Sequence, residues 1–217
     1  MDINPNTLNQ KERYKLLIGA ILPRPIAWVS SIDDQGNPNL APYSFFTIGA
    51  TDPMTLIFCP QIRTDSLAKK DTLRNIERIP EFVVNLTNEQ TASAMNQTAT
   101  VLPPGQSEFV WAGLTPVPSE TITVPRVKES PVAFECVLQQ IVTINEGRGG
   151  GSAVFGEVKH IHIRDDIYKD GYVILEELMP IGRLAGSSYA RVSDIFDLQR
   201  DPPPAEEDFQ RVGNEIE

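Results

Sequence analysis

The chain has 217 residues, 41% of them hydrophobic and 22% charged, and a formal net charge of −10 at pH 7. This length and composition are typical of one soluble globular domain with appendages. The acidic balance argues against nucleic acid and anionic membrane surfaces as partners, because both present phosphates that repel it. No apolar stretch reaches the roughly 20 residues of a membrane helix, and the amino terminus lacks the basic and apolar regions of a signal peptide. We therefore expect a cytoplasmic protein with no membrane or nucleic-acid partner.

The first part of the chain alternates β-forming segments with turn residues. Residues 25–32 (PIAWVSSI) and 39–48 (NLAPYSFFTI) flank the turn cluster 33–37, and together they predict a hairpin. Residues 54–59 (MTLIFC) form a compact apolar run, which predicts a third, buried strand.

A helical period replaces the strand pattern over residues 64–79. From Leu73 onward, apolar residues recur at i, i+3 and i+6, which predicts one apolar helix face. Asp71 is the predicted N-cap and Thr72 the first helical residue. Pro80 ends the helix.

The central and later segments return to strands. Residues 81–86 (EFVVNL) predict a strand, and residues 88–97 predict a short helix. Prolines interrupt residues 98–130, where we expect an irregular insertion that wraps the domain. Residues 131–144 and 153–163 predict two long strands joined by a glycine-rich hairpin loop.

The elements sum to six or more short strands, a few short helices and no strand–helix–strand alternation. Residues 172–175 are expected to pair again. This pattern predicts a mainly β, antiparallel barrel with helical decorations. We expect a single domain over residues 1–198. The acidic, proline-rich residues 199–217 form a tail that is disordered or reaches across a partner.

Common nucleotide-binding and hydrolase motifs are absent. The sequence has no GxGxxG between a strand and a helix, no P-loop and no GxSxG. His160 and His162, the only histidines, alternate on one predicted strand without a cysteine or carboxylate cluster, so we expect no metal site. Cys59 and Cys136 lie in apolar runs and are interpreted as core residues.

Two segments suit a phosphorylated, planar cofactor. Lys69, Lys70, Asp71 and Thr72 place two cations and a hydroxyl at a helix start, where free N–H groups and the helix dipole favour an anion. Alternatively, the aspartate caps the helix and the lysines are solvated. The segment 42–46 could offer backbone groups and aromatic side chains to a flat ring, or it could be a core strand with a bulge.

Two arginines stand in restricted backbone settings. Arg24 lies between Pro23 and Pro25, and the second proline holds it out of a helix. Arg183 lies in the glycine-containing turn 182–186. Neither arginine indicates a site on its own.

Nine motifs occur in order along the chain. They are RPIAWVSSIDDQG at 24–36, NLAPYSFF at 39–46, DP at 52–53, KKDTLRNIER at 69–78, EFVVNL at 81–86, EFxxAGLTPVPS at 108–119, ESPVAFEC at 129–136, FGEVKHIHI at 155–163 and IGRLAGSSY at 181–189. In this order and spacing the chain resembles the flavin reductase-like family of FMN-binding split-barrel proteins. The resemblance covers roughly residues 15 to 190.

The resemblance implies a six-stranded antiparallel Greek-key split barrel with short flanking helices. It also implies a homodimer with FMN near the subunit interface. The residues that it places around FMN are Arg24, Trp28, Ser30, Ser31, Pro42, Tyr43, Ser44, Phe45, Phe46, Lys69, Lys70, Asp71, Thr72, Asn85 and Arg183. Residues 42–46 would contact the ring through their backbone.

The implied function is an oxidoreductase in which FMN takes a hydride from NADH or NADPH. Electrons would then pass to free flavin, oxygen, a metal complex or an oxygenase partner. One alternative is a flavoprotein oxygenase or electron carrier that another protein reduces. The other is an FMN-binding or sensing module without turnover.

Overall fold

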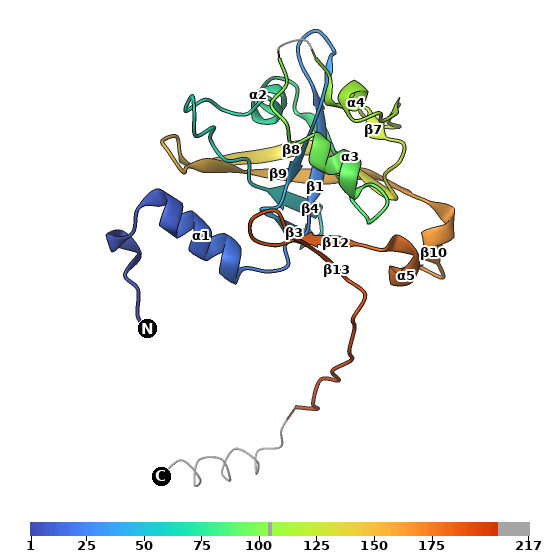
Figure 1. Cartoon of the computed structure of the whole chain (residues 1–217). Coiled ribbons are helices and arrows are strands. Elements are labelled where there is room, and N and C mark those ends of the chain that lie inside the picture. The colour runs from blue at the N-terminus through green and yellow to red at the C-terminus, as the bar shows by residue number, and fades with distance from the viewer. Residues whose placement is uncertain (104–105, 204–217) are drawn as a thin grey trace.

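A seven-stranded antiparallel sheet forms the centre of the fold in the computed structural model, which describes residues 1–103 and 106–203 (Figure 1). The strand order is β2-β1-β5-β8-β9-β4-β3. Its members are β1 (Ala27–Ile32), β2 (Pro38–Tyr43), β3 (Phe46–Thr51), β4 (Met54–Phe58), β5 (Glu81–Leu86), β8 (Val132–Asn145) and β9 (Gly151–Ile163). The predicted mainly β, antiparallel architecture is confirmed.

The two edge strands of this sheet are neighbours in the sequence. Only Ser44 and Phe45 separate the end of β2 from the start of β3. Such a link spans at most about 11 Å, so the two sheet edges meet at this corner and the sheet closes on itself. The expected single strand 39–48 is therefore divided in two, which is why the sheet has seven strands rather than six.

The barrel interior is filled by large apolar side chains from most of these strands. Tyr43, Phe58 and Phe82 stack in sequence, with ring centroids 5.1 and 5.5 Å apart. A side chain at Gly156 would collide with the Phe82 ring, so glycine lets β9 pass close to this stack. Other buried members of the cluster are Ala27, Val29, Leu56, Leu73, Ile76, Val84, Cys136 and Val154.

Helix α2 (Asp71–Arg78) packs Leu73 and Ile76 into this interior. Pro80 follows its end, as predicted. The predicted start was wrong by one residue: Lys70, not Asp71, is the N-cap, and Asp71, not Thr72, is the first helical residue. The reason is that arginines engage the Asp71 carboxylate, which leaves it unable to cap the helix.

Buried polar groups fasten the predicted insertion, of which residues 98–103 and 106–130 are described, to the barrel. Ser30 donates to the Pro125 carbonyl at 2.6 Å, and Asn85 accepts from the Val127 N–H at 2.9 Å. Nearby, the 3₁₀ helix η2 (Asp165–Ile167) follows β9. Other short elements are α3 (Ala92–Gln97), α4 (Glu108–Trp111), β6 (Pro116–Val117), β7 (Arg126–Val127), β10 (Tyr168–Lys169), β11 (Tyr172–Val173) and α5 (Leu175–Leu178).

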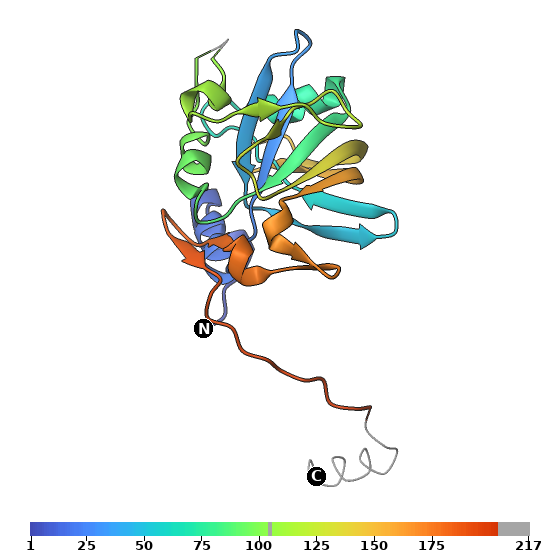
Figure 2. The same cartoon turned by 90° about the vertical axis from the view of Figure 1, so that its right-hand side faces the viewer.

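Both ends of the described chain extend away from the barrel (Figures 1 and 2). The 3₁₀ helix η1 (Pro5–Thr7) precedes α1 (Gln10–Ala20), which was not predicted and buries none of its residues. After the hairpin of β12 (Ile181–Arg183) and β13 (Tyr189–Arg191), an extended and exposed segment begins. Of the predicted tail, residues 204–217 lie outside the described residues. No helix in the described part of the chain is long and apolar enough to cross a membrane.

Candidate functional site

A cavity of about 730 Å³ lies between β2, the start of α2 and the insertion. Residues 98–103 and 106–108 form one wall, while β2 and α2 form the other. Side chains of both charges line the cavity: Arg63, Lys70, Arg74, Arg78, Asp33, Asp65, Asp71 and Glu108. The volume falls in the range of pockets that hold cofactors.

The start of α2 presents free hydrogen-bond donors to this cavity. Lys70 makes no side-chain capping bond. The backbone N–H groups of Asp71 and Thr72 have no protein acceptor in the part of the chain that the structure describes. Burial, together with nearby Arg63, lowers the pKa of Lys70. A partly desolvated cation beside free N–H groups favours an anion such as phosphate.

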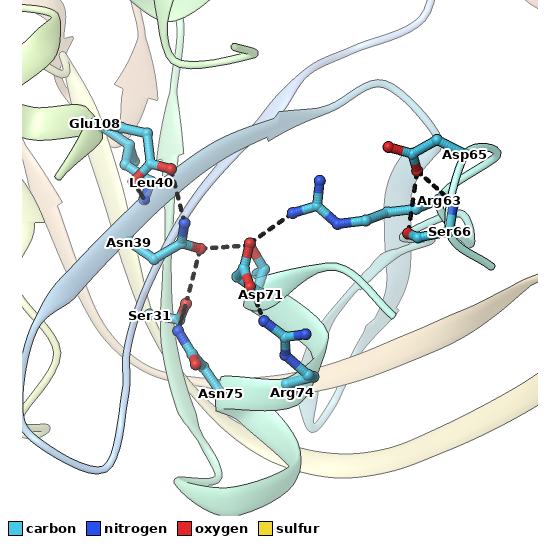
Figure 3. Close-up of polar contacts among 11 residues, drawn as sticks. Ser31, Asn39, Leu40, Arg63, Asp65, Ser66, Asp71, Arg74, Asn75 and Glu108 are labelled. Atoms are coloured by element: carbon cyan, nitrogen blue, oxygen red, sulfur yellow. Dashed lines mark hydrogen bonds and ion pairs between the residues drawn. The ribbon is translucent and has the colours of Figure 1, made fainter. Parts of the chain in front are cut away.

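Asp71 orients the arginines at the same end of α2 (Figure 3). Arg63 Nη2 donates to Asp71 Oδ2 at 2.6 Å, and Arg74 Nη2 donates to Asp71 Oδ1. The carboxylate would repel a phosphate directly, but it holds two guanidinium groups at the cavity wall. The contacts of Asp71 are therefore with the two guanidinium groups.

Tyr43 brings a buried hydroxyl without a partner to the cavity. The residue is 4% exposed, and its hydroxyl makes no hydrogen bond of ordinary geometry with any described residue, although Thr72 lies close enough to act on its pKa. Burial strongly raises the pKa of Tyr43, so the phenol stays protonated and remains a donor. The Lys70 ammonium lies 5.1 Å from the centre of the Tyr43 ring. An unpaired buried hydroxyl costs stability, and a ligand in the cavity could supply its acceptor.

A chain of polar contacts links the insertion to α2 behind this surface (Figure 3). Glu108 of α4 accepts from Asn39 Nδ2 at 3.1 Å and from the Leu40 N–H at 3.1 Å. Thr72 Oγ1 donates to Asn39 Oδ1 at 2.8 Å. Burial raises the pKa of Glu108, although the bonds from Leu40 and Asn39 oppose this shift.

Comparison with known proteins relates this chain to a family with flavin chemistry. A flavin reductase like domain matches residues 19–177. The chain belongs to this family. The crystal structure of nitrilotriacetate monooxygenase component B from Bacillus cereus is 40% identical, with a TM-score of 0.87 over 91% of this chain and 98% of that chain.

One further structure supports the family assignment, and another supports the fold. The 2-nitrobenzoate 2-nitroreductase NbaA from Pseudomonas fluorescens is 32% identical, with a TM-score of 0.84 over 95% of this chain and all of that chain (100%). A flavin reductase with a split barrel domain from Shewanella frigidimarina NCIMB 400 has a TM-score of 0.78 at 21% identity, over 93% and 100% of the two chains. This flavin reductase-like chain is therefore a split-barrel oxidoreductase with a flavin-related function.

Five of the residues predicted to bind the cofactor line the cavity of this flavin reductase-like protein. They are Pro42, Tyr43, Lys70, Asp71 and Thr72. Ser31 lies directly behind them, where it donates to Asn39 and accepts from Asn75. The structure thus brings the two predicted segments, 42–46 and 69–72, together at one surface through residues 42–43 of the first and 70–72 of the second.

The other residues of these two segments lie outside the cavity lining. Lys69 is not among the cavity residues, and its ammonium pairs with Glu77 at 2.6 Å. Ser44, Phe45 and Phe46 form the corner between β2 and β3 and also lie outside the cavity lining. Their place in a flavin site stays a prediction.

The predicted arginines engage backbone carbonyl groups instead of the cavity. Arg24 is 6% exposed, and its guanidinium donates to Ile18, Ile21 and Leu184 at 2.8–3.0 Å. Burial lowers the pKa of Arg24. Arg183 donates to Gly186 and lies 4.5 Å from the centre of the Tyr189 ring. Arg24 therefore fastens the end of α1, and neither arginine lines the cavity.

Trp28, Ser30 and Asn85 form the attachment of the insertion. Each is fully buried. Trp28 Nε1 donates to Thr98 Oγ1 at 2.8 Å, and Asn85 Nδ2 donates to the Trp28 carbonyl at 2.9 Å. The structure gives these three residues protein partners and places them away from the cavity.

Residues that sequence reasoning missed complete the cavity. Asn39, Arg63, Arg74, Arg78 and Glu108 all line it. Asn39, Arg74, Arg78 and Glu108 all belong to quoted motifs. For Asn39 and Arg74, the nearby Tyr43 and Lys70 gave a local signal. Glu108 carried none, because its contact with β2 joins residues far apart in the sequence.

The histidines form a separate cluster on β9. Their ring centroids are 4.7 Å apart, and His162 Nε2 lies 2.6 Å from Glu135 Oε1. Glu135 is fully buried and belongs to the anchoring of the insertion.

Proposed function

We propose that this chain is an NAD(P)H-dependent FMN oxidoreductase. The observation that carries the proposal is the cavity, where the unpartnered Tyr43 hydroxyl and the partly desolvated Lys70 meet the free N–H groups at the start of α2. These groups fit a ligand that combines a phosphate with hydrogen-bond acceptors on a flat ring.

The residues present match the parts of FMN. Lys70, Arg63 and Arg74 would hold the phosphate together with the N–H groups of α2. Tyr43 would donate a hydrogen bond to the bound molecule. The chemistry that FMN supplies when bound is acceptance of a hydride and onward transfer of electrons. No nucleophile or strong general base is needed for that reaction.

Steady-state turnover tests the proposal. The purified chain is mixed with FMN or FAD, and oxidation of NADH or NADPH is followed. We expect FMN-dependent oxidation of one or both nucleotides at rates well above those of free flavin. Oxidation no faster than with flavin alone would contradict the reductase function.

A second candidate follows from the two more similar structures. One is a component of a monooxygenase and the other a nitroreductase. A component that supplies reduced flavin should turn over excess free FMN, whereas a nitroreductase should keep its flavin and reduce an added nitroaromatic compound. The two activities are separated by testing whether the reduced flavin leaves the protein.

We also propose that the functional unit is a homodimer. Helix α1 has 11 residues and no buried side chain, and isolated helices of this length are marginal in water. Leu17 and Ile21 are 54% and 59% exposed. A second copy that covers these side chains would explain why the helix persists.

A further inference from the structure

We infer that the C-terminal arm, residues 192–203, packs on helix α1 of a second copy of this chain, and that two copies exchange their arms in this way. The inference rests on the homodimer proposed above and deepens it, because it names the segment that covers α1. It also gives a partner to the arm, whose large apolar side chains are exposed in the single chain.

Helix α1 presents an apolar stripe to solvent. Tyr14, Leu17 and Ile21 recur at i, i+3 and i+7, so they lie along one face of the helix. Leu17 and Ile21 are more than half exposed, Tyr14 is 47% exposed, and no residue of the helix is buried. The described part of the same chain therefore leaves the stripe uncovered, although a short helix needs packing of its apolar face to persist in water.

The C-terminal arm is equally uncovered. It follows β13 as an extended segment that runs away from the barrel (Figures 1 and 2). Phe196 and Leu198 are 79% and 83% exposed. Residues two apart share a face of an extended chain, so these two side chains form an apolar face of the arm. Large apolar side chains gathered and exposed in this way are typical of an interaction surface.

The charges of the two segments decide which surfaces pair. Helix α1 has three basic residues and one acidic residue, a net charge of +2, although the whole chain carries −10. The arm has three aspartates, at positions 194, 197 and 201, against Arg200, a net charge of −2. Pairing of α1 with the arm joins opposite charges, whereas pairing of α1 with α1 or of arm with arm joins like charges. Exposed ion pairs contribute little each, so the apolar faces supply most of the stability and the charges select the partner.

The two segments leave the barrel from neighbouring points. The Arg24 guanidinium donates to the Ile21 carbonyl at the end of α1, at 2.8 Å, and to the Leu184 carbonyl in the turn before β13, at 3.0 Å. The arm begins at Val192, directly after β13. A two-fold axis beside this end of the molecule brings each arm to α1 of the other copy, so that both contacts form together.

Two single variants remove the two sides of the contact separately. Leu17→Glu places a charge in the stripe of α1 and leaves the arm intact, whereas Phe196→Glu alters the arm and leaves α1 intact. Sedimentation equilibrium should give a dimer for the unaltered chain and a dissociation constant raised by about 30-fold or more in each variant. Phe196→Leu, which keeps a large apolar side chain, should retain the dimer. The melting temperature of each variant separates a folding defect from loss of the contact.

A mixture of the two single variants tests the exchange itself. In the mixed dimer, the intact arm of the Leu17→Glu chain meets the intact α1 of the Phe196→Glu chain, so one of the two contacts is restored. The dimer of either variant alone has no intact contact. With one variant fluorescently labelled, we expect the mixed dimer to be tighter than the dimer of either variant.

Three outcomes would overturn the inference. A Phe196→Glu chain that dimerises like the unaltered chain would leave α1 as a contact but exclude the arm. Absence of recovery in the mixture would show that the arm does not pack on α1 of the other copy. An unaltered chain that is monomeric would reject the proposed homodimer itself, and a lower melting temperature of Phe196→Glu would then show that the arm folds onto its own chain.

Discussion

Lys69 and Lys70 are adjacent in the sequence but lie in different environments. Lys70 lines the cavity, and burial lowers its pKa, whereas Lys69 pairs with Glu77 outside the cavity. We predict that Lys70→Ala weakens FMN binding by about 1.5–3 kcal/mol, the usual value of a charged hydrogen bond. Lys69→Ala is the matched control and should change affinity little. Equal losses in fluorescence titrations of the two variants would reject the assignment of Lys70.

Tyr43 offers a test in which binding and stability change in opposite directions. Its buried hydroxyl lacks a partner in the flavin-free chain, so Tyr43→Phe removes a polar group that costs stability. We predict an equal or higher melting temperature without flavin and FMN binding weaker by about 1 kcal/mol. A lower melting temperature with unchanged affinity would mean that the hydroxyl serves the fold.

At the scale of elements, the anchoring of the insertion depends on a buried carboxylate. Burial alone would raise the pKa of Glu135, but hydrogen bonds from Thr121, His162 and the Glu120 N–H outweigh it and lower the pKa to about 2. Because the pKa of Glu135 is lower in the folded chain than its ordinary value of 4.5, the carboxylate stabilises the fold above pH 4.5. That stabilisation is lost as the pH falls from 4.5 toward 2.

Glu135→Gln should therefore reduce stability at pH 7 and flatten the acid dependence. We expect a difference on the order of 3 kcal/mol, measured by urea unfolding at a series of pH values. Glu81→Gln is the control, since Glu81 accepts from Thr123 of the same insertion at a more exposed place. If Glu135→Gln kept the acid dependence of the unaltered chain, another group would be responsible.

The elements that could be predicted are those with a local pattern. Strand β5 was predicted at its observed bounds, 81–86, because its apolar run is bordered by clear turn residues. Helix α1 could not be predicted from a buried face, because it has none. The corner at Ser44 and Phe45 looked like part of one strand, since only the barrel closure separates β2 from β3.

The candidate site was likewise predictable only where a local sequence pattern indicated it. Tyr43 and Lys70 lie in short segments whose chemistry suits a cofactor, and both line the cavity. Trp28 and Asn85 come from equally characteristic segments, yet they hold the insertion. Resemblance alone does not separate a ligand contact from a residue that positions the cavity wall. Contacts between segments far apart in the sequence determine whether a residue lines the cavity or holds its wall. The same is true of Glu108, whose contact with β2 brings it to the cavity.

At the scale of the whole molecule, the exposed face of α1 predicts self-association. Light scattering after size exclusion should give twice the mass of one chain. Leu17→Glu should shift the chain toward the monomer, because the charge would be buried in the contact. Lys11→Glu, which changes an exposed residue on the same helix, should leave the dimer intact. A monomeric unaltered chain, or a dimer insensitive to Leu17→Glu, would contradict α1 as the contact.

The most direct measurement is an anaerobic absorbance experiment on the chain with bound FMN. NADH and NADPH are added separately, and loss of the visible flavin absorbance is followed in time. We predict that at least one nucleotide bleaches the bound flavin much faster than free FMN. Flavin that binds but stays oxidised with both nucleotides would contradict NAD(P)H-dependent reduction and favour reduction by a partner protein. A chain that binds no flavin would contradict the flavin site itself.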